Sequence, residues 1–181
     1  MIIVAYYTDK YKEEFERFKA SCENYNFNFY IEKAIDRGSW EANTHYKAEF
    51  VKKVRDIFKL PVVYVDIDAI IKKEPVLFDE LDCDISAHIL KHRLEQKEFL
   101  GGTIYINYTD KATEVVNKWV EKCSRVSELY EQVKLRQSID ETEGVKFEEL
   151  PIEYCAIFDH QKVQGIEPVI LHMQASRKYR R

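Results

Sequence analysis

Residues 60–69 join an apolar run to two aspartates. The run Leu-Pro-Val-Val-Tyr over residues 60–64 is typical of a strand that is buried on both faces. Asp66 and Asp68 follow where this strand should end, and side chains two residues apart in an extended chain point to the same side. Buried carboxylates are costly unless they are paired or bind a metal ion. The segment therefore predicts a buried strand that ends in a site for Mg²⁺ or Mn²⁺ and a diphosphate.

Strands and helices alternate before this segment. Residues 2–6 form a strand without a polar face, and apolar residues recur at helical spacing between positions 11 and 22. A short strand is expected over residues 28–31, followed by a helix that Asn43 or Thr44 caps. This order predicts an α/β fold with a mostly parallel central sheet and helices on both faces.

The second half of the chain has a more mixed pattern. Strands are expected over residues 84–88, 103–106 and 168–172, and helices over 112–123 and 126–135. The chain has 181 residues, no internal repeat and no low-complexity linker. We therefore expect a single domain over residues 1–181.

Composition narrows the possible partners and location. The net charge of −4 argues against an overall electrostatic attraction to nucleic acid. The four cysteines share no metal-type spacing, which favours a reducing compartment. The N-terminus lacks a basic region, and no apolar run is long enough to cross a membrane, so we expect a cytoplasmic protein. The basic residues 177–181 are interpreted as a solvated terminus, with phosphate, DNA or an anionic membrane as the alternatives.

Lys47 and His172 are candidate ligand-binding residues. Lys47 precedes the apolar positions 50, 51 and 54, so a helix places it on the buried face near the helix N-terminus, where anions are favoured. We expect it to meet a phosphate; the alternative is a lysine whose stem covers the edge of the core. His172 ends the last apolar strand and could bind a metal ion, or it could be a structural histidine.

Three further positions carry weaker signals. Gly101 and Gly102 permit close approach of a ligand to the backbone, or they form a plain hairpin turn. Asp84 could line the same crevice as the aspartate pair, or it could be a solvated loop acid. Gln137 has no distinguishing pattern of its own.

Taken in order, the motifs resemble those of GT-A nucleotide-sugar glycosyltransferases, nearest the glycogenin-like and lipopolysaccharide galactosyltransferase-like group. The resemblance spans nearly the whole chain. The similar blocks are Thr44-His45-Tyr46-Lys47-Ala48, Val63-Tyr64-Val65-Asp66-Ile67-Asp68-Ala69-Ile70-Ile71, Phe99-Leu100-Gly101-Gly102-Thr103-Ile104-Tyr105-Ile106-Asn107, Leu150-Pro151 with Tyr154-Cys155, and His172-x-x-Ala175-x-x-Lys178. The resemblance implies the GT-A (Rossmann-like) fold and sugar transfer from a nucleoside-diphosphate sugar, with UDP and a retaining mechanism favoured.

The resemblance also implies residue roles. Asp66, Asp68 and His172 would hold Mn²⁺ (or Mg²⁺), and Asp66 would also reach the ribose. Lys47 and Lys178 would meet the diphosphate or the donor sugar. The nucleotide base would lie against Ala5, Tyr6, Tyr7 and Thr8. Gly102 and Gln137 would lie near the transferred sugar, and Asp84, Asp140 and Glu153 are candidates for a base on the acceptor hydroxyl.

The chain departs from the family pattern at three positions. Arg136 replaces the usual acid before Gln137, Ala175 replaces a glycine, and Gly101 replaces an asparagine. These departures leave open a module that binds nucleotide sugars without turnover. A HAD-type phosphohydrolase fits less well, because its D-x-D lies on the first strand and a Thr or Val follows. The acceptor, whether glycan, protein, lipid or modified nucleic acid, and the formation of a homo-oligomer remain open.

Overall fold

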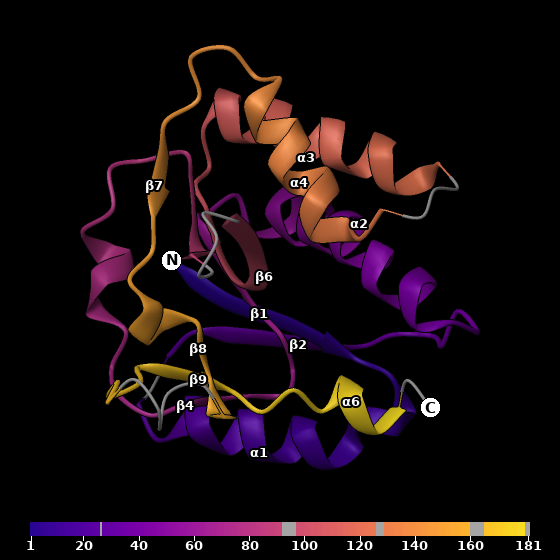
Figure 1. Cartoon of the computed structure of the whole chain (residues 1–181), viewed down its shortest axis with the longest axis vertical. Coiled ribbons are helices and arrows are strands. Elements are labelled where there is room, and N and C mark those ends of the chain that lie inside the picture. The colour runs from indigo at the N-terminus through magenta and orange to yellow at the C-terminus, as the bar shows by residue number, and fades with distance from the viewer. Residues whose placement is uncertain (26, 92–96, 126–128, 160–164, 180–181) are drawn as a thin grey trace.

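A central sheet of six strands forms the frame of the protein (Figure 1). The computed structural model describes residues 1–25, 27–91, 97–125, 129–159 and 165–179. The strand order is β2-β1-β3-β6-β5-β7. The strands are β1 (Ile2–Tyr7), β2 (Phe29–Lys33), β3 (Val62–Val65), β5 (Ile85–Lys91), β6 (Lys97–Ile106) and β7 (Phe147–Glu149). β6 is antiparallel to both neighbours, β3 and β5, and the other three pairings are parallel. The predicted α/β fold with a mostly parallel sheet is confirmed.

Helices cover both faces of this sheet (Figure 1). Helix α1 (Lys12–Glu23) covers one face, and α2 (Trp40–Phe58), α3 (Asp110–Ser124) and α4 (Glu131–Asp140) cover the other. Short 3₁₀ helices are η1 (Asp9–Tyr11), η2 (Val76–Asp79) and η3 (Ile152–Tyr154), and the short helix α6 (Ser176–Tyr179) lies at the C-terminal end of the described chain. Within the described residues, no helix has the length and apolarity needed to cross a membrane.

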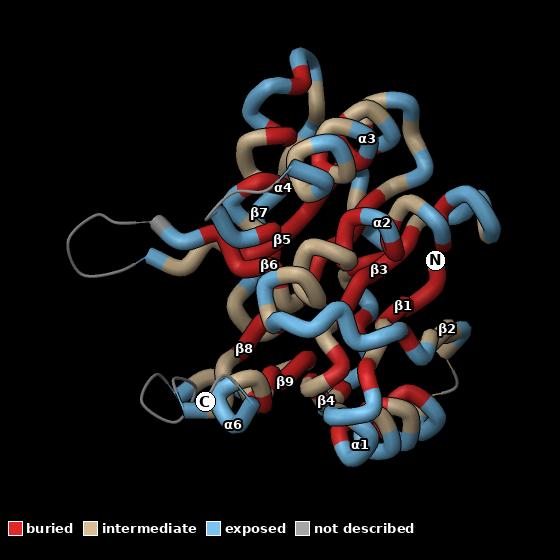
Figure 2. The backbone as a smooth tube through the Cα atoms, turned by 90° about the vertical axis from the view of Figure 1, so that its right-hand side faces the viewer, coloured by how far each residue is buried: buried red, intermediate tan, exposed pale blue. Residues whose placement is uncertain are grey.

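The alternation of side chains along β3 shows why the strand is apolar on both faces. Val62 and Tyr64 pack into the core under α2, α3 and α4, whereas Val63 and Val65 pack with Phe18 of α1 into the opposite core. All four strand residues are buried, and Figure 2 shows the buried course of β1, β3 and β6 through the molecule. Full burial of each aliphatic side chain contributes about 1.5–3 kcal/mol.

A second, smaller sheet brings the C-terminal part of the chain to the aspartate pair. It contains β4 (Ala69–Ile71), β9 (Ile170–His172) and β8 (Ala156–Ile157), with β9 in the middle. β9 is antiparallel to β4, so that His172 pairs with Ala69. The register therefore places the last strand directly beside the turn that holds Asp68.

Two helices and one strand differ from the sequence-based expectations. Helix α2 begins at Trp40 and not near Asn43 or Thr44, because the side chain of Ser39 accepts a hydrogen bond from the Ala42 backbone N–H (3.0 Å). Helix α4 begins at Glu131; the prediction for residues 126–128 falls outside the described residues. Gly101 and Gly102 lie inside β6 and do not form a hairpin turn.

Candidate active site

A cavity of about 520 Å³ opens at the carboxyl ends of β1 and β3. In open α/β sheets, ligands bind outside these strand ends. Segments far apart in the sequence supply the lining: the end of β1, the start of α2, the turn Asp66-Ile67-Asp68 (the D-x-D turn), the middle of β6, the start of α4 and the chain from β9 to α6. Of the residues that the sequence singles out, Tyr6, Tyr7, Thr8, Lys47, Asp66, Asp68, Gly102 and His172 line this cavity.

The D-x-D turn is held by contacts on both sides. The Asp66 backbone N–H donates to Gly102 O (2.8 Å), and the Tyr64 hydroxyl donates to Asp66 Oδ1 (2.8 Å). Asp68 Oδ2 accepts a hydrogen bond from the Ala175 backbone N–H (2.7 Å). The turn therefore connects β6 to the chain that follows β9, which explains how Asp68 and the C-terminal segment come together.

His172 lies against β6 because Gly102 has no side chain. A Cβ at position 102 would lie 2.9 Å from His172 Cε1, closer than real Cβ contacts come. The imidazole is buried, with Nε2 2.8 Å from Thr103 Oγ1 and Nδ1 3.8 Å from Asp68 Oδ1. Burial alone would lower the His172 pKa, but the charges and hydrogen bonds of Cys155 and Asp68 outweigh it and raise the pKa to about 10.

The donor set at this position suits a hard divalent cation. Two carboxylates and an imidazole line the cavity, and such ligands are accepted by Mn²⁺. The Asp66 side chain is 40% exposed, so it is accessible from the cavity. Burial and the nearby Asp68 charge raise the pKa of Asp66, whereas the hydrogen bond and charge of His172 lower the pKa of Asp68 despite burial. Among the described residues, no group of three His, Cys, Asp or Glu side chains has the arrangement of a metal site. Asp68 and His172 are close to each other, with 3.8 Å between Asp68 Oδ1 and His172 Nδ1.

Lys47 is buried and neutralised by two carboxylates. Its Nζ donates to Gly101 O (2.9 Å) and to Glu131 Oε1 (3.0 Å), and lies 3.1 Å from Asp66 Oδ1. These carboxylates raise the Lys47 pKa, although burial acts in the opposite direction. Its position on the buried face of the helix is confirmed. Its placement at the helix N-terminus is wrong, because α2 starts at Trp40 and Lys47 lies in the third turn.

An acid followed by a glutamine lines the cavity at the start of α4. These residues are Glu131 and Gln132, five positions before the Arg136-Gln137 pair on which the sequence comparison relied. Arg136 instead pairs with Asp140 (Nη2 to Oδ1, 2.6 Å), and Gln137 does not line the cavity. The acid and glutamine that the structure brings to the cavity are therefore Glu131 and Gln132.

Gly101 accommodates this glutamine. A Cβ at position 101 would lie 3.1 Å from Gln132 Cβ. The space that a side chain at position 101 would fill is thus taken by the Gln132 side chain of α4. The signal available in the sequence was the dipeptide Glu131-Gln132 itself, but its relevance depends on the start of α4.

Five other residues with an expected site role lie outside the cavity lining: Ala5, Asp84, Asp140, Glu153 and Lys178. Asp84 precedes β5, at the end of the strands opposite to the cavity, and the next residue, Ile85, pairs with Ile106 of β6. The Asp84 carboxylate accepts a hydrogen bond from the Lys146 backbone N–H (2.8 Å). Ala5 is fully buried inside β1. Neither Asp84 nor Ala5 is therefore brought into the cavity lining with the D-x-D aspartates.

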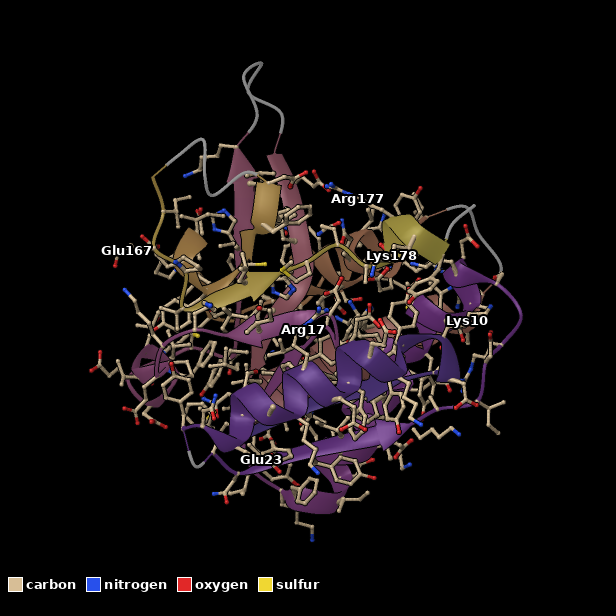
Figure 3. All side chains as sticks on the ribbon, turned by 90° about the horizontal axis from the view of Figure 1, so that it is seen from below. Lys10, Arg17, Glu23, Glu167, Arg177 and Lys178 are labelled. Atoms are coloured by element: carbon tan, nitrogen blue, oxygen red, sulfur yellow. The ribbon has the colours of Figure 1, made fainter. Side chains whose placement is uncertain are left out.

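Lys178 also lies beside the cavity and does not line it. Its ammonium is 3.7 Å from Glu14 Oε1, and its side chain is 65% exposed. Glu14 is buried, and neither of its carboxylate oxygens has a hydrogen-bond partner among the residues that the structure describes. Figure 3 shows α6, with Arg177 and Lys178, beside the N-terminal end of α1. Arg177 lines the cavity in place of the predicted lysine.

Two tyrosines that the sequence reasoning missed close the cavity near the end of β1. The rings of Tyr11 and Tyr179 make an edge-to-face contact with centroids 4.7 Å apart, and both residues line the cavity. Burial and the charges of Asp68 and Asp66 raise the Tyr11 pKa. The Tyr6 hydroxyl donates to Asn43 O (2.7 Å) and links β1 to the start of α2. A tyrosine after the first strand was visible in the sequence, but its partner 168 positions later was not.

Solved structures with a similar fold are glycosyltransferases. The chain is similar to a glycosyltransferase involved in glycosylation of the major capsid of PBCV-1, with 14% identity, a TM-score of 0.77, and coverage of 99% of this chain and 96% of that one. It is also similar to the galactosyltransferase LgtC in complex with donor and acceptor sugar analogues, with 15% identity, a TM-score of 0.63, and coverage of 95% and 86%. The glycosyltransferase GlyE of Streptococcus pneumoniae TIGR4 matches with 17% identity and a TM-score of 0.66 over 94% of this chain and 53% of that chain.

Comparisons with protein-family models and with curated proteins found no match. Because the identities to the solved structures are low, these similarities establish the fold. The six-stranded sheet, the helices on both faces and the cavity at the strand ends agree with that assignment. The chain therefore has the GT-A fold of glycosyltransferases.

Proposed function

We propose that this chain is a metal-dependent glycosyltransferase that uses a nucleoside-diphosphate sugar, with UDP favoured as the nucleotide. One observation carries the proposal: the D-x-D turn, His172 and the Glu131-Gln132 pair line a single cavity in a fold shared with glycosyltransferases. Cavities of 300–1,000 Å³ are typical of sites for small ligands, and this one has about 520 Å³.

Asp66, Asp68 and His172 would hold the Mn²⁺ or Mg²⁺ ion. When bound, such an ion neutralises the charge that develops on the departing diphosphate. Met173 N–H donates to Asp68 O (3.3 Å), and Ala175 N–H holds its carboxylate, so the chain after β9 is positioned by the same aspartate. Arg177 is the cation of this segment that faces the cavity, and we assign to it the diphosphate contact that the sequence suggested for Lys178.

Gln132 is the residue that we place beside the reacting carbon of the donor sugar. The similar solved structures include an active-site mutant of LgtC in which a glutamine is replaced by glutamate, with 13% identity to this chain. Glu131, the residue before Gln132, forms a buried ion pair with Lys47, and removal of one partner from such a pair is strongly destabilising. The pair therefore serves to hold the start of α4 against β6.

The transfer step would follow a retaining course. An acceptor hydroxyl oxygen forms the new bond to C1 of the sugar, while the bond from C1 to the β-phosphate oxygen breaks and its electron pair stays with the diphosphate. The hydroxyl proton passes to that departing oxygen. Tyr6, Tyr7, Thr8 and Tyr11 would lie against the nucleotide.

The experiment is a thermal-shift titration with UDP and UDP-sugars, with and without Mn²⁺. We expect stabilisation that depends on Mn²⁺ and is lost in Asp68→Asn. The matched control is Asp82→Asn, which changes an exposed aspartate outside the cavity. If no nucleoside diphosphate stabilises the wild-type protein in the presence of Mn²⁺, the donor-site proposal is wrong.

The main alternative is a module that binds nucleotide sugars without turnover. Its support came from Arg136 and Gly101, and it weakens because Glu131-Gln132 lines the cavity and packs on Gly101. A nucleotide-release assay over a panel of sugar donors separates the two. Binding without transfer or slow hydrolysis would favour the module.

A further inference from the structure

Thr103 of β6 places a hydroxyl group among apolar side chains. It pairs with Val65 of β3, and the side chains of directly opposite strand residues lie on the same face of a sheet. Val65, and Tyr105 two residues further along β6, belong to the apolar core on the α1 side. Thr103 is fully buried, and valine has the same shape without the hydroxyl. Because a buried hydroxyl costs free energy unless it is hydrogen-bonded, the partner of this group determines what it does.

The partner of the Thr103 hydroxyl is the imidazole of His172. Thr103 Oγ1 lies 2.8 Å from His172 Nε2. The other ring nitrogen, Nδ1, faces the D-x-D turn and lies 3.8 Å from Asp68 Oδ1. The two nitrogens of this imidazole therefore have different surroundings, since one meets a hydroxyl group inside the sheet and the other meets a carboxylate that lines the cavity.

The position of the imidazole proton decides which nitrogen can bind a metal ion. A neutral imidazole carries one N–H, and only the other nitrogen has a free lone pair. With the proton on Nε2, this N–H donates to Thr103 Oγ1, and the lone pair of Nδ1 faces Asp68. With the proton on Nδ1, the Thr103 O–H donates to Nε2, whose lone pair then points into the sheet and away from Asp68. Only the first arrangement allows His172 and Asp68 to hold the same ion.

Cys155 is a second polar neighbour of the imidazole. It precedes β8, which pairs with β9, and it also hydrogen-bonds His172. A thiol is a weak donor and a weak acceptor, whereas a hydroxyl oxygen accepts an imidazole N–H well. The hydroxyl of Thr103 is therefore the stronger partner of the ring, and Cys155 provides a comparison for the experiment.

We propose that Thr103 is a positioning residue for the metal ligand His172. Its hydroxyl oxygen accepts the Nε2 proton and so presents Nδ1 as the nitrogen that binds the ion. This inference rests on the proposed function, because it requires a divalent cation that Asp68 and His172 hold. Thr103 does not line the cavity and acts only through the histidine. Hydrogen bonds of this kind orient metal-binding histidines and raise their affinity for the ion.

The first measurement is the Mn²⁺ affinity in the presence of UDP, from the free Mn²⁺ signal in electron paramagnetic resonance. Thr103→Val removes the acceptor and should weaken Mn²⁺ on the order of 10–100-fold, whereas Thr103→Ser keeps the hydroxyl and should retain the wild-type affinity. The matched control is Thr142→Val. Thr142 is also buried, and its hydroxyl donates to Ser138 O (2.8 Å), but it lies outside the cavity lining. This control should leave the Mn²⁺ affinity unchanged.

The second measurement identifies the nitrogen that binds the ion. Whole protein with ¹⁵N in its five histidines is loaded with UDP and ¹¹³Cd²⁺, and the cadmium–nitrogen coupling is read by nuclear magnetic resonance. His172→Gln identifies the signal of His172. We expect coupling to Nδ1 and a proton on Nε2 in the wild type and in Thr103→Ser, and loss of the Nδ1 coupling in Thr103→Val. A purely structural role of the threonine would not change which nitrogen is coupled.

The outcomes separate this inference from the proposed function. Coupling of ¹¹³Cd to Nε2 in the wild type overturns the role of Thr103 without recourse to any variant that folds poorly. Wild-type Mn²⁺ affinity in Thr103→Val also overturns it, and a loss of affinity in Cys155→Ala alone would assign the role to the thiol. In each of these cases the donor site stands. If the wild type binds no Mn²⁺ with UDP, the proposed function itself is wrong.

Discussion

Replacement of Gly102 by alanine should damage the metal site through His172. The added Cβ would lie 2.9 Å from Cε1, 3.1 Å from Nδ1 and 3.3 Å from Nε2 of the imidazole. Carbon atoms are normally about 3.5–4.0 Å apart, so the ring must recede by roughly 0.6–1 Å. Thr103 and the strand pairing of β9 with β4 restrict that movement. Overpacking of this kind costs about 1–3 kcal/mol of unfolding free energy.

The expected loss of metal affinity follows from the same displacement. Metal–ligand distances in functional sites vary by only about 0.2 Å, so a ligand moved by more than half an ångström no longer reaches the ion in the correct position. We expect Mn²⁺ affinity in the presence of UDP to fall on the order of 10–100-fold. The free Mn²⁺ signal in electron paramagnetic resonance measures this affinity, and urea unfolding measures the stability.

The neighbouring glycine provides the control. Gly101→Ala meets Gln132 and not His172, with a Cβ contact of 3.1 Å. It should retain the wild-type Mn²⁺ affinity while affecting turnover. Wild-type stability and Mn²⁺ affinity in Gly102→Ala would refute the claim that this glycine creates the space for His172.

Three further predictions concern other parts of the structure. Lys47→Met should lower the unfolding free energy by about 3–5 kcal/mol in urea melts, because it leaves the buried Glu131 unpaired; an unchanged melt would contradict the buried ion pair. Asp84→Asn should lower stability by about 1–3 kcal/mol through lost hydrogen bonds, yet retain the thermal shift with UDP and Mn²⁺; loss of that shift would return Asp84 to the site. Burial acts to raise the pKa of Glu32, but its lysine and tyrosine partners outweigh burial and lower this pKa. The ionised Glu32 side chain therefore stabilises the fold above the ordinary glutamate pKa, and this contribution is lost as the pH falls through the lowered pKa. Glu32→Gln should reduce the loss of stability between pH 5 and pH 3 by acid titration, and an identical profile would show that this carboxylate does not contribute.

Much of the fold could be predicted because its signals are local. The strand at residues 2–6 and the strand before Asp66 are apolar on both faces, which requires cover on both sides. The buried position of Lys47 followed from helical spacing alone. The antiparallel direction of β6 was not predictable in this way, since strand direction depends on how distant segments pair.

The candidate site was only partly predictable for the same reason. The start of α4 decides whether Glu131-Gln132 or Arg136-Gln137 faces the cavity. A shift of five residues along a helix changes which side chains point inward. Asp84 directly precedes β5, and the carboxyl end of β5 is the end that lies near the cavity, so Asp84 lies at the opposite end of that strand.

The delivery of Asp66 and Asp68 to a sheet end by an apolar strand is predictable from residues 60–69 alone, because burial and two-residue periodicity act within one short segment. Which distant residues meet that pair depends on how the elements pack together. Pairing of β9 with β4 brings His172 to Asp68, and the convergence of α2 with α4 joins Trp40 to Tyr130. Such contacts depend on the register between segments up to about a hundred residues apart, and no local pattern encodes that register.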